Sequence, residues 1–297
     1  MKIHPTLLQR AAILLAISLL GGCASVSSTD SGAIGIDRKQ YFSDGVRERV
    51  LTDAAKGYNE NLTKALTHRA VNADAKSTQR VVNITNRLIP HAKAFRAEAV
   101  DWQWEVNVLS VDQVNAYCMA GGKIMIYTGL LDAVQSDDEL AAVIGHEIAH
   151  ALRDHTAEKI STRSRNNSVA SGLGSVLSIG LALTTGINLH KTAQDVSQLG
   201  AHAMANLPNS RELEHEADRM GLELMARAGY NPMAAAAFWR RSIEASAKEG
   251  QANKSAFWST HPSGGDRVND ILVIAPKVQP LYQDAVAAAK TKTEATK

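Results

Sequence analysis

The chain has 297 residues, of which 45% are hydrophobic and 21% charged, a composition typical of a globular protein long enough to bury a sizeable core. Its formal net charge is only +2, so composition gives no electrostatic reason to expect a nucleic-acid partner. Aromatic residues make up 5% of the chain, so aliphatic side chains and alanine must supply most of the packing.

Residues 1–22 are typical of a signal peptide. Lys2 and Arg10 give the segment a positive start, and residues 11–20 form an uncharged apolar stretch that is short for a membrane span. Small residues directly before Cys23 resemble a bacterial lipobox, in which signal cleavage leaves Cys23 as the lipidated N-terminus. The next residue is alanine and not aspartate, which by that resemblance favours the periplasmic face of the outer membrane. A non-lipidated secretory signal or a short membrane anchor is the alternative.

The rest of the chain divides into three predicted parts. Residues 23–45 are rich in Ser, Gly and Asp and predict a lipidated, flexible tether. Residues 46–285 predict one domain, and residues 286–297 have little apolar bulk and are expected to fray. Cys118 is the second of two cysteines; with Cys23 acylated no internal disulfide can form, so Cys118 is expected to be a packed thiol.

The predicted domain begins with helices and then changes period. Apolar residues at helical spacing predict two or three helices within residues 46–100. Residues 102–108 alternate apolar and polar side chains, which is the pattern of a half-buried strand. Two further short strands are predicted at 115–119 and 123–127, joined by a glycine pair that suits a hairpin turn.

From Ser136 the sequence predicts helix again. Ser136 and Glu139 resemble a capping box in front of a strongly apolar run, and most of the chain to about residue 285 is expected to be helical. Residues 168–189 are uncharged but rich in Gly, Ser and Thr. They favour a small-residue helix or helical hairpin packed on the domain, with a mobile lid or a membrane-surface contact as the alternative. The predicted class is α+β, mainly helical, with a small antiparallel sheet.

Residues 146–150 spell H-E-x-x-H within the apolar run. Residues four apart on a helix share a face, so the imidazoles of His146 and His150 can meet one zinc ion. Glu147 is then close enough to a metal-bound water to act as the general base of peptide hydrolysis. A chance match on a solvent-facing helix is the alternative. Two histidines and a glutamate inside an apolar helix are costly, however, unless a metal satisfies them.

Zinc needs a third protein ligand. The metzincin extension of the motif requires glycine and histidine where the chain has Arg153 and Thr156, so that class is excluded. His155 lies five residues beyond His150, about 140° round a continuous helix, and is expected to face elsewhere and to be structural.

A better candidate is the segment SRELEHEAD. Glu214 and Asp218 are four apart and share a helix face, so Glu214 can ligate zinc while Asp218 accepts a hydrogen bond from a ligand histidine. Glu212 and Glu216 are expected to point away, towards solvent or salt bridges. A solvated face of carboxylates, or His215 as the ligand in place of Glu214, are the alternatives.

HEIAH, SRELEHEADRMG and, near the C-terminus, THPSGGDRV together resemble peptidase family M48, the HtpX-like gluzincin zinc metalloproteases, over roughly residues 75–275. Within the family the chain is most similar to the soluble periplasmic lipoprotein branch. The resemblance implies a zincin-like domain whose small sheet packs on the active-site helix, and one zinc ion per chain. It also implies Glu214 as the third ligand, with Asp218 beside it.

The same resemblance implies further roles. Asn115 and Ala116 match the family's edge-strand segment, whose backbone would pair with an extended substrate peptide. His261 and Arg267 match a C-terminal pattern in which a histidine can approach the metal or the tetrahedral oxyanion and an arginine supports the same region. For His261 a turn at a capped helix boundary is the alternative.

The function implied by these motifs is a zinc-dependent endopeptidase that cuts unfolded or misfolded envelope proteins and is attached to the membrane through lipid on Cys23. One alternative is a chaperone-like scaffold for outer-membrane protein assembly in which proteolysis is suppressed. Another is a zinc-binding domain without catalysis, which Glu147 disfavours because a structural site has no need of it. His261 on the metal would indicate a self-inhibited protease.

Overall fold

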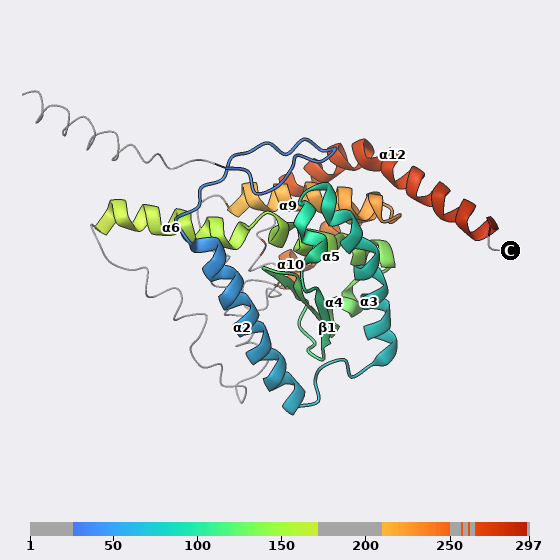
Figure 1. Cartoon of the computed structure of the whole chain (residues 1–297). Helices are drawn as coiled ribbons and strands as arrows, with labels where there is room; N and C mark the ends of the chain where they lie inside the picture. Colours follow the sequence, from blue (N-terminus) through green and yellow to red (C-terminus); the bar gives the residue numbers. More distant parts are fainter. Residues whose placement is uncertain (1–25, 172–209, 250–256, 258–260, 262–264, 296–297) are drawn as a thin grey trace, which may run out of the picture.

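The computed structural model describes residues 26–171, 210–249, 257, 261 and 265–295 (Figure 1). The predicted signal peptide, the lipidation at Cys23 and most of the segment 168–189 lie outside the described residues. Helices surround one three-stranded sheet, which confirms the mainly helical α+β class. The helices are α2 (Val46–Thr67), α3 (Ala75–Leu88), the 3₁₀ turns η1 (Ile89–Ala94) and η2 (Ala97–Asp101), α4 (Thr128–Ala133), α5 (Asp137–Leu152), α6 (His155–Ser171), α9 (Ser210–Arg227), α10 (Met233–Glu249) and α12 (Gly265–Ala295). The strands are β1 (Glu105–Leu109), β2 (Ala116–Met119) and β3 (Lys123–Tyr127).

The sheet is mixed, which corrects the prediction of an antiparallel sheet. β2 and β3 form the expected hairpin, with Gly121 and Gly122 at φ 79° and 85°, a region that favours glycine. The strand order is β1-β3-β2, and β1 pairs in parallel with β3. The chain passes from β1 to the far edge and returns between the two strands, so β3 runs in the direction of β1. Alternation of side chains predicts strands but does not encode this order.

Side chains of β3 are buried on both faces of the sheet. Ile124 and Ile126 belong to the main core with α3 and α5, whereas Met125 and Tyr127 belong to a second cluster with Tyr58 of α2. Successive residues of a strand point to opposite faces, so the sheet lies between α2 and α5. β2 packs on α5, and the sheet is therefore positioned to form one wall beside that helix.

α5 is the buried centre of the fold. Ser136 Oγ accepts a hydrogen bond from the Glu139 N–H (3.2 Å), and Glu139 Oε2 accepts one from the Gln135 N–H (2.7 Å), which confirms the capping signal. Every residue from Glu139 to Leu152 is buried, because α3, α9, α10 and β2 surround the helix. Its polar side chains therefore face protein.

Residues 26–45 pack against the domain, which corrects the prediction of a flexible tether for this stretch. Ile36 is part of the main core. Gln40 is buried, and its side-chain amide donates to the backbone oxygen of Arg153 (2.6 Å). Low apolar content suggested a tether, but the polar side chains of this segment find buried partners, which composition cannot reveal.

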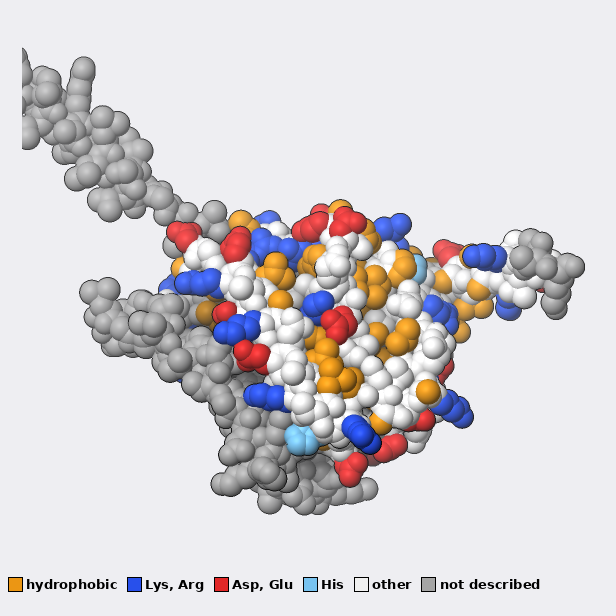
Figure 2. Space-filling view, turned by 60° about the horizontal axis from the view of Figure 1, so that its bottom comes forward, with side chains coloured by type: hydrophobic (Ala, Val, Ile, Leu, Met, Phe, Trp, Pro, Cys, Tyr) orange, Lys and Arg blue, Asp and Glu red, His pale blue; other side chains and the backbone are white. Residues whose placement is uncertain are grey.

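α12 continues to Ala295 and carries the C-terminal end away from the body (Figure 1). Its side chains from 287 to 294 are exposed, so the frayed tail predicted for residues 286–297 is replaced, as far as 295, by a helical end with little packing. Among the described helices, none is both long and apolar enough to cross a membrane. Figure 2 shows acidic and basic side chains interspersed over one face, in line with the small net charge.

Candidate metal centre

Three candidate residues come from one face of α5. His146, Glu147 and His150 are 1%, 3% and 4% exposed. The Nε2 atoms of His146 and His150 lie 3.0 Å apart, as the i, i+4 spacing on a helix predicts. Both imidazoles therefore present a ring nitrogen to the same point inside the protein.

α9 brings the second motif to this point. It crosses α5 at a glycine pair: a Cβ added to Gly221 would lie 2.8 Å from the backbone N of His146, and one added to Gly145 would lie 3.0 Å from the oxygen of Gly221. This close crossing places Glu214 Oε2 3.3 Å from Nε2 of His146 and Glu214 Oε1 3.6 Å from Nε2 of His150.

His261 completes the cluster. Its Nδ1 lies 3.2 Å from Nε2 of His146 and 3.0 Å from Oε2 of Glu214. Its ring stacks on Phe257 with the ring centroids 4.7 Å apart, and its backbone N–H donates to the backbone oxygen of Phe257 (2.8 Å). One ligand atom from each of the four side chains His146, His150, Glu214 and His261 lies within 4.8 Å of the others.

The four side chains fit a metal ion. Their neighbouring donor atoms are 3.0 to 3.6 Å apart, close to the spacing of about 3.3 Å for ligands bound tetrahedrally at about 2.0–2.1 Å. Glu214 Oε1 is buried and has no hydrogen-bond partner within the described residues. A buried carboxylate oxygen of that kind is costly unless a cation satisfies it.

Asp218 supports His146 from the side opposite the cluster. Its Oδ1 lies 2.9 Å from Nδ1 of His146, and Arg267 donates to both of its oxygens at 2.8 and 2.7 Å. Burial opposes the ionisation of Asp218, but Arg267 and His146 prevail and hold its pKa below the usual value. Because an ionised carboxylate only accepts hydrogen bonds, Nδ1 of His146 is the donor and Nε2 keeps a lone pair for the metal.

Arg267 also touches the ligand carboxylate. Its Nη1 lies 3.4 Å from Oε2 of Glu214, and its guanidinium lies over the Trp239 ring, 4.6 Å from the centroid. The rings of Trp239 and Phe257 stack with their centroids 5.4 Å apart and line the cluster beside His146. Neither aromatic stands at a spacing that links it to a motif, so the sequence carries no signal for this position beside the cluster.

Glu147 stands beside the four side chains of the cluster and is not one of them. Its Oε1 lies 3.3 Å from Nε2 of His261. Burial raises the pKa of Glu147 to about 7, and a carboxyl group that titrates near neutrality can both take and return a proton. The backbone N–H of Cys118 faces the same carboxylate. Burial also raises the pKa of the Cys118 thiol well above its usual range, as expected of a packed thiol.

His155 lies against His150, which corrects the prediction that it faces elsewhere. α5 ends at Leu152, and the turn at Asp154 (φ 53°) starts α6 in a new direction. The angle of a continuous helix therefore does not apply. Nδ1 of His155 lies 2.8 Å from Nδ1 of His150. His155 is not one of the four side chains of the cluster.

The other residues of the second motif divide between surface and interior. Glu212 is exposed, and His215 pairs with Asp270 (3.2 Å) instead of joining the cluster. Glu216 is buried and paired with Arg38 and Arg153. Of the two alternatives predicted for it, the salt bridge is therefore confirmed and exposure to solvent is wrong.

Asn115 and Ala116 lie at the outer edge of the sheet beside α5. β2 is an edge strand, and the Ala116 N–H donates to the side-chain oxygen of Asn115 (3.0 Å). Just before them, the backbone oxygen of Val114 accepts a hydrogen bond from the N–H of Phe257 (3.2 Å). Pairing of a substrate along this edge stays a prediction.

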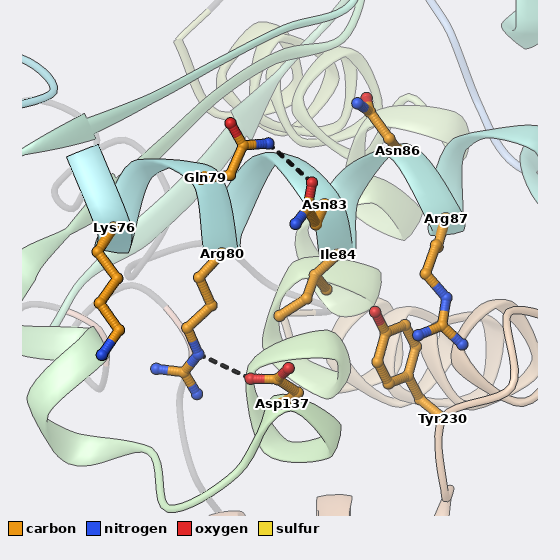
Figure 3. A pocket seen from close by; sticks show the side chains of 9 residues that line it. All are labelled: Lys76, Gln79, Arg80, Asn83, Ile84, Asn86, Arg87, Asp137 and Tyr230. Atoms are coloured by element: carbon orange, nitrogen blue, oxygen red, sulfur yellow. Dashed lines mark hydrogen bonds and ion pairs between the residues drawn. The ribbon is translucent and has the colours of Figure 1, made fainter.

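An open groove lies along α3, apart from the cluster (Figure 3). Arg80 pairs with Asp137 at the start of α5 (2.7 Å), and the guanidinium of Arg87 lies 4.1 Å from the centroid of the Tyr230 ring. None of the four side chains of the cluster lines this groove. Its polar groups tie α3 to α5 and to the end of α9, and we assign no chemistry to it.

A buried cluster of two motif histidines and a glutamate from a second helix, with another glutamate alongside that can move a proton, defines a metallopeptidase. The model of Peptidase family M48 matches residues 75–275, and the chain belongs to this family.

Several relatives support this assignment. The mitochondrial metalloendopeptidase OMA1 of Schizosaccharomyces pombe is 36% identical over 185 residues, which cover 60% of this chain and 49% of the relative. The metalloprotease LoiP of Escherichia coli is 28% identical over 266 residues, 88% of this chain and 94% of the relative. The beta-barrel assembly-enhancing protease of Escherichia coli O157:H7 is 24% identical over 216 residues, 70% of this chain and 41% of the relative. The chain spans half or less of the OMA1 relatives from Schizosaccharomyces pombe, Arabidopsis thaliana and Saccharomyces cerevisiae.

Proposed function

We propose that this protein is a zinc-dependent endopeptidase held latent by His261, and that it hydrolyses peptide bonds of unfolded or misfolded envelope proteins. The observation that carries the proposal is the position of His261, whose Nδ1 lies 3.2 Å from Nε2 of His146 and 3.0 Å from Oε2 of Glu214. With His150 as the other ligand, this is the fourth corner of a tetrahedral site, the corner that catalytic zinc sites keep open.

Zinc is the metal that best suits this set of side chains. Two histidines and one glutamate are a ligand set of catalytic zinc. Glu214 is fully buried and its Oε1 has no hydrogen-bond partner within the described residues, so a divalent cation between it and the two histidines neutralises a buried carboxylate. Bound zinc supplies Lewis-acid chemistry, since it polarises a peptide carbonyl and lowers the pKa of water.

The protein's own groups divide the remaining work. Glu147 takes the proton of the attacking water and returns it to the leaving amine, and its buried Oε1 has no hydrogen-bond partner within the described part of the chain. Arg267 pairs with Asp218 and lies against Glu214, so its charge favours the ionised form of both carboxylates. Asp218 fixes the tautomer and the ring orientation of His146.

Two contacts oppose substrate entry in the described state. His261 occupies the fourth corner and also lies 3.3 Å from Oε1 of Glu147. The backbone oxygen of Val114 already accepts a hydrogen bond from the N–H of Phe257. Val114 directly precedes Asn115 and Ala116, whose edge would pair with an extended peptide. Hydrolysis therefore requires His261 to leave the cluster.

Digestion of an unfolded protein by the zinc-loaded full-length chain tests this function, beside the variants Glu147→Gln and His261→Ala and their double variant. We expect His261→Ala to cleave faster than the wild type. Either protein with Glu147→Gln added should lose activity by a factor on the order of 10²–10⁴, the contribution of a general base. Zinc content, measured for each variant, separates lost chemistry from lost metal.

Two outcomes contradict the assignments. Equal cleavage with Glu147→Gln at full zinc content excludes Glu147 as the base. Loss of activity in His261→Ala at full zinc content means that His261 takes part in catalysis and does not hold the enzyme latent.

We further propose that the protein is an outer-membrane lipoprotein facing the periplasm, on the strength of the small residues before Cys23 and the alanine after it. The wild type should incorporate labelled palmitate and sediment with membranes, and Cys23→Ser should do neither. Cys118→Ser, which removes the other cysteine, should behave as the wild type. Labelling of Cys23→Ser excludes this attachment site.

A chaperone-like scaffold for outer-membrane protein assembly is the second candidate. The position of His261 at the fourth corner favours it, because this state offers no open position at the site for a substrate. The beta-barrel assembly-enhancing protease among the relatives supports the same idea by its name. If Glu147→Gln restores barrel assembly as well as the wild type in cells that lack the protein, the scaffold role is favoured.

A further inference from the structure

Behind the ligand His150 lies a second imidazole. Nδ1 of His155 is 2.8 Å from Nδ1 of His150, on the side of the ring opposite the cluster. The other nitrogen of His155, Nε2, is 3.2 Å from Oε2 of Glu216. All three side chains are buried. They form a continuous line from a metal ligand to a carboxylate that lies outside the centre.

The proton positions along this line follow from its two ends. At the inner end, Nε2 of His150 faces the cluster and needs its lone pair for the metal, so Nδ1 carries the proton. His155 then accepts at Nδ1 and donates from Nε2. At the outer end, Glu216 accepts that hydrogen bond, since an ionised carboxylate is only an acceptor. Every hydrogen bond of the line therefore has one donor and one acceptor when His150 is oriented for metal binding.

Two arginines from different parts of the chain hold Glu216 in place. Arg38, in the N-terminal segment (residues 26–45), donates from Nε to Oε1 (2.9 Å) and from Nη2 to Oε2 (2.7 Å). Arg153, which is fully buried, donates from Nη2 to Oε1 (3.2 Å). Arg38 also pairs with Glu158 of α6 through both of its Nη atoms. Such bidentate pairs fix the direction of a carboxylate as well as its charge.

The support of His146 has the same construction. There a carboxylate, Asp218, accepts from the imidazole and is clamped by two donors of Arg267. On the side of His150 the carboxylate is one imidazole further away, and the clamp comes from Arg38 and Arg153. The two ligand histidines are thus oriented by two separate lines, and only the first was evident from the spacing of the motif.

We propose that His155, Glu216 and Arg38 are positioning residues that orient His150 for zinc, and that the N-terminal segment is thereby part of the metal centre. The inference rests on the proposed zinc site and not on peptide hydrolysis. A protein that binds zinc as a scaffold needs the same support, so the two proposals fail separately.

The test is zinc affinity, measured on the full-length chain by competition with a chromogenic chelator. His155→Leu should weaken zinc binding roughly 10–100-fold, the usual cost of removing a partner of a metal ligand. His155→Gln should restore most of it, because the amide offers an acceptor and a donor at about the separation of the two ring nitrogens. A merely structural role of His155 predicts no such rescue.

Arg38→Met carries the test to the N-terminal segment. It should weaken zinc binding about tenfold, the lower end of that range, because Arg153 still holds Glu216. Arg47→Met is the matched control, since Arg47 is also an arginine near the N-terminal segment but pairs with Asp154 of the α5–α6 turn (2.7 Å). We expect its zinc affinity to equal that of the wild type.

Thermal unfolding of the metal-free proteins separates positioning from folding. If His155→Leu or Arg38→Met lowers the melting temperature of the metal-free form while zinc affinity stays at the wild-type level, the residues only stabilise the fold and the proposal is wrong. Equal losses of zinc affinity in Arg38→Met and Arg47→Met also overturn it. The proposal is supported if Arg38→Met loses zinc affinity while Arg47→Met does not, and if His155→Gln recovers the affinity that His155→Leu loses.

Discussion

At the scale of the residue, Asp218 meets two demands from a fully enclosed position. It accepts the Nδ1 proton of His146 and carries the charge that balances Arg267. Removal of its carboxylate leaves a buried guanidinium without its main partner, at a cost of about 3–5 kcal/mol. The same change lets the ring of His146 rotate or take the other tautomer, so metal binding suffers beyond the loss of stability.

We therefore expect Asp218→Ala to weaken zinc binding roughly 10–100-fold. Chelator competition on the folded variant measures this. Asp270→Ala is a fitting control, because Asp270 also pairs with an arginine, Arg219 (2.7 Å), yet touches none of the ligands. Unchanged zinc affinity in Asp218→Ala shows that His146 needs no carboxylate to hold its orientation.

Spacing along a helix predicted the residues that share one helix face. His146 with His150, and Glu214 with Asp218, each lie four apart, and the structure brings both pairs to one point. His155 was beyond such reasoning, because the turn at Asp154 redirects the chain after Leu152. Arg38 is linked to Glu216 only by tertiary folding, and no local pattern indicates that contact.

At the scale of the element, the crossing of α5 and α9 sets the geometry of the centre. Gly145 and Gly221 face each other, and the backbones approach so closely that a Cβ on Gly221 would lie 2.8 Å from His146 N and 3.1 Å from the backbone carbon of Gly145. These nearest atoms belong to the backbone of a buried helix and cannot swing aside. The glycine pair thus fixes the distance between the helix of two ligands and the helix of the third.

Gly221→Ala should force the two helices apart. We expect the free energy of unfolding to fall by about 1–3 kcal/mol, the usual cost of overpacking, and zinc affinity to fall with it because Glu214 moves away from the histidines. Denaturant unfolding and chelator competition measure the two effects. Gly57→Ala provides the contrast: nothing lies within 4 Å of a Cβ there, so a helical alanine should stabilise by about 0.5–1 kcal/mol. If neither the free energy of unfolding nor the zinc affinity changes in Gly221→Ala, the crossing of α5 and α9 can accommodate a methyl group and the glycine pair does not fix their distance.

Elements with a clear period were predicted at nearly the right places, whereas their pairing was not. The strands 115–119 and 123–127 correspond to β2 and β3. The direction of β1 relative to β3 depends on which strand fills the centre of the sheet, and that is decided by packing on α2 and α5. The low apolar content of residues 26–45 predicts a tether, yet Gln40 and Arg38 are fixed by the carboxylates of Glu158 on α6 and Glu216 on α9.

At the scale of the whole molecule, the metal centre joins segments that are distant in the chain. Its side chains come from α5, from α9 and from His261, and their supports come from α6, α12 and the N-terminal segment. An ion held by this set binds the folded state alone, because the unfolded chain does not bring these groups together. Metal binding and the stability of the whole domain are therefore linked.

This linkage predicts the effect of metal removal on folding. At a free zinc concentration about a hundred times the dissociation constant, binding stabilises the folded state by about 2.7 kcal/mol. In a domain of this size each kcal/mol shifts the melting temperature by roughly 2–4 °C, so chelation should lower it by roughly 5–10 °C. His146→Ala should melt at one temperature with or without the chelator, since it lacks one of the four side chains that face the metal. Equal chelator shifts in His146→Ala and the wild type would place the stabilising ion elsewhere in the protein and separate the cluster from the metal.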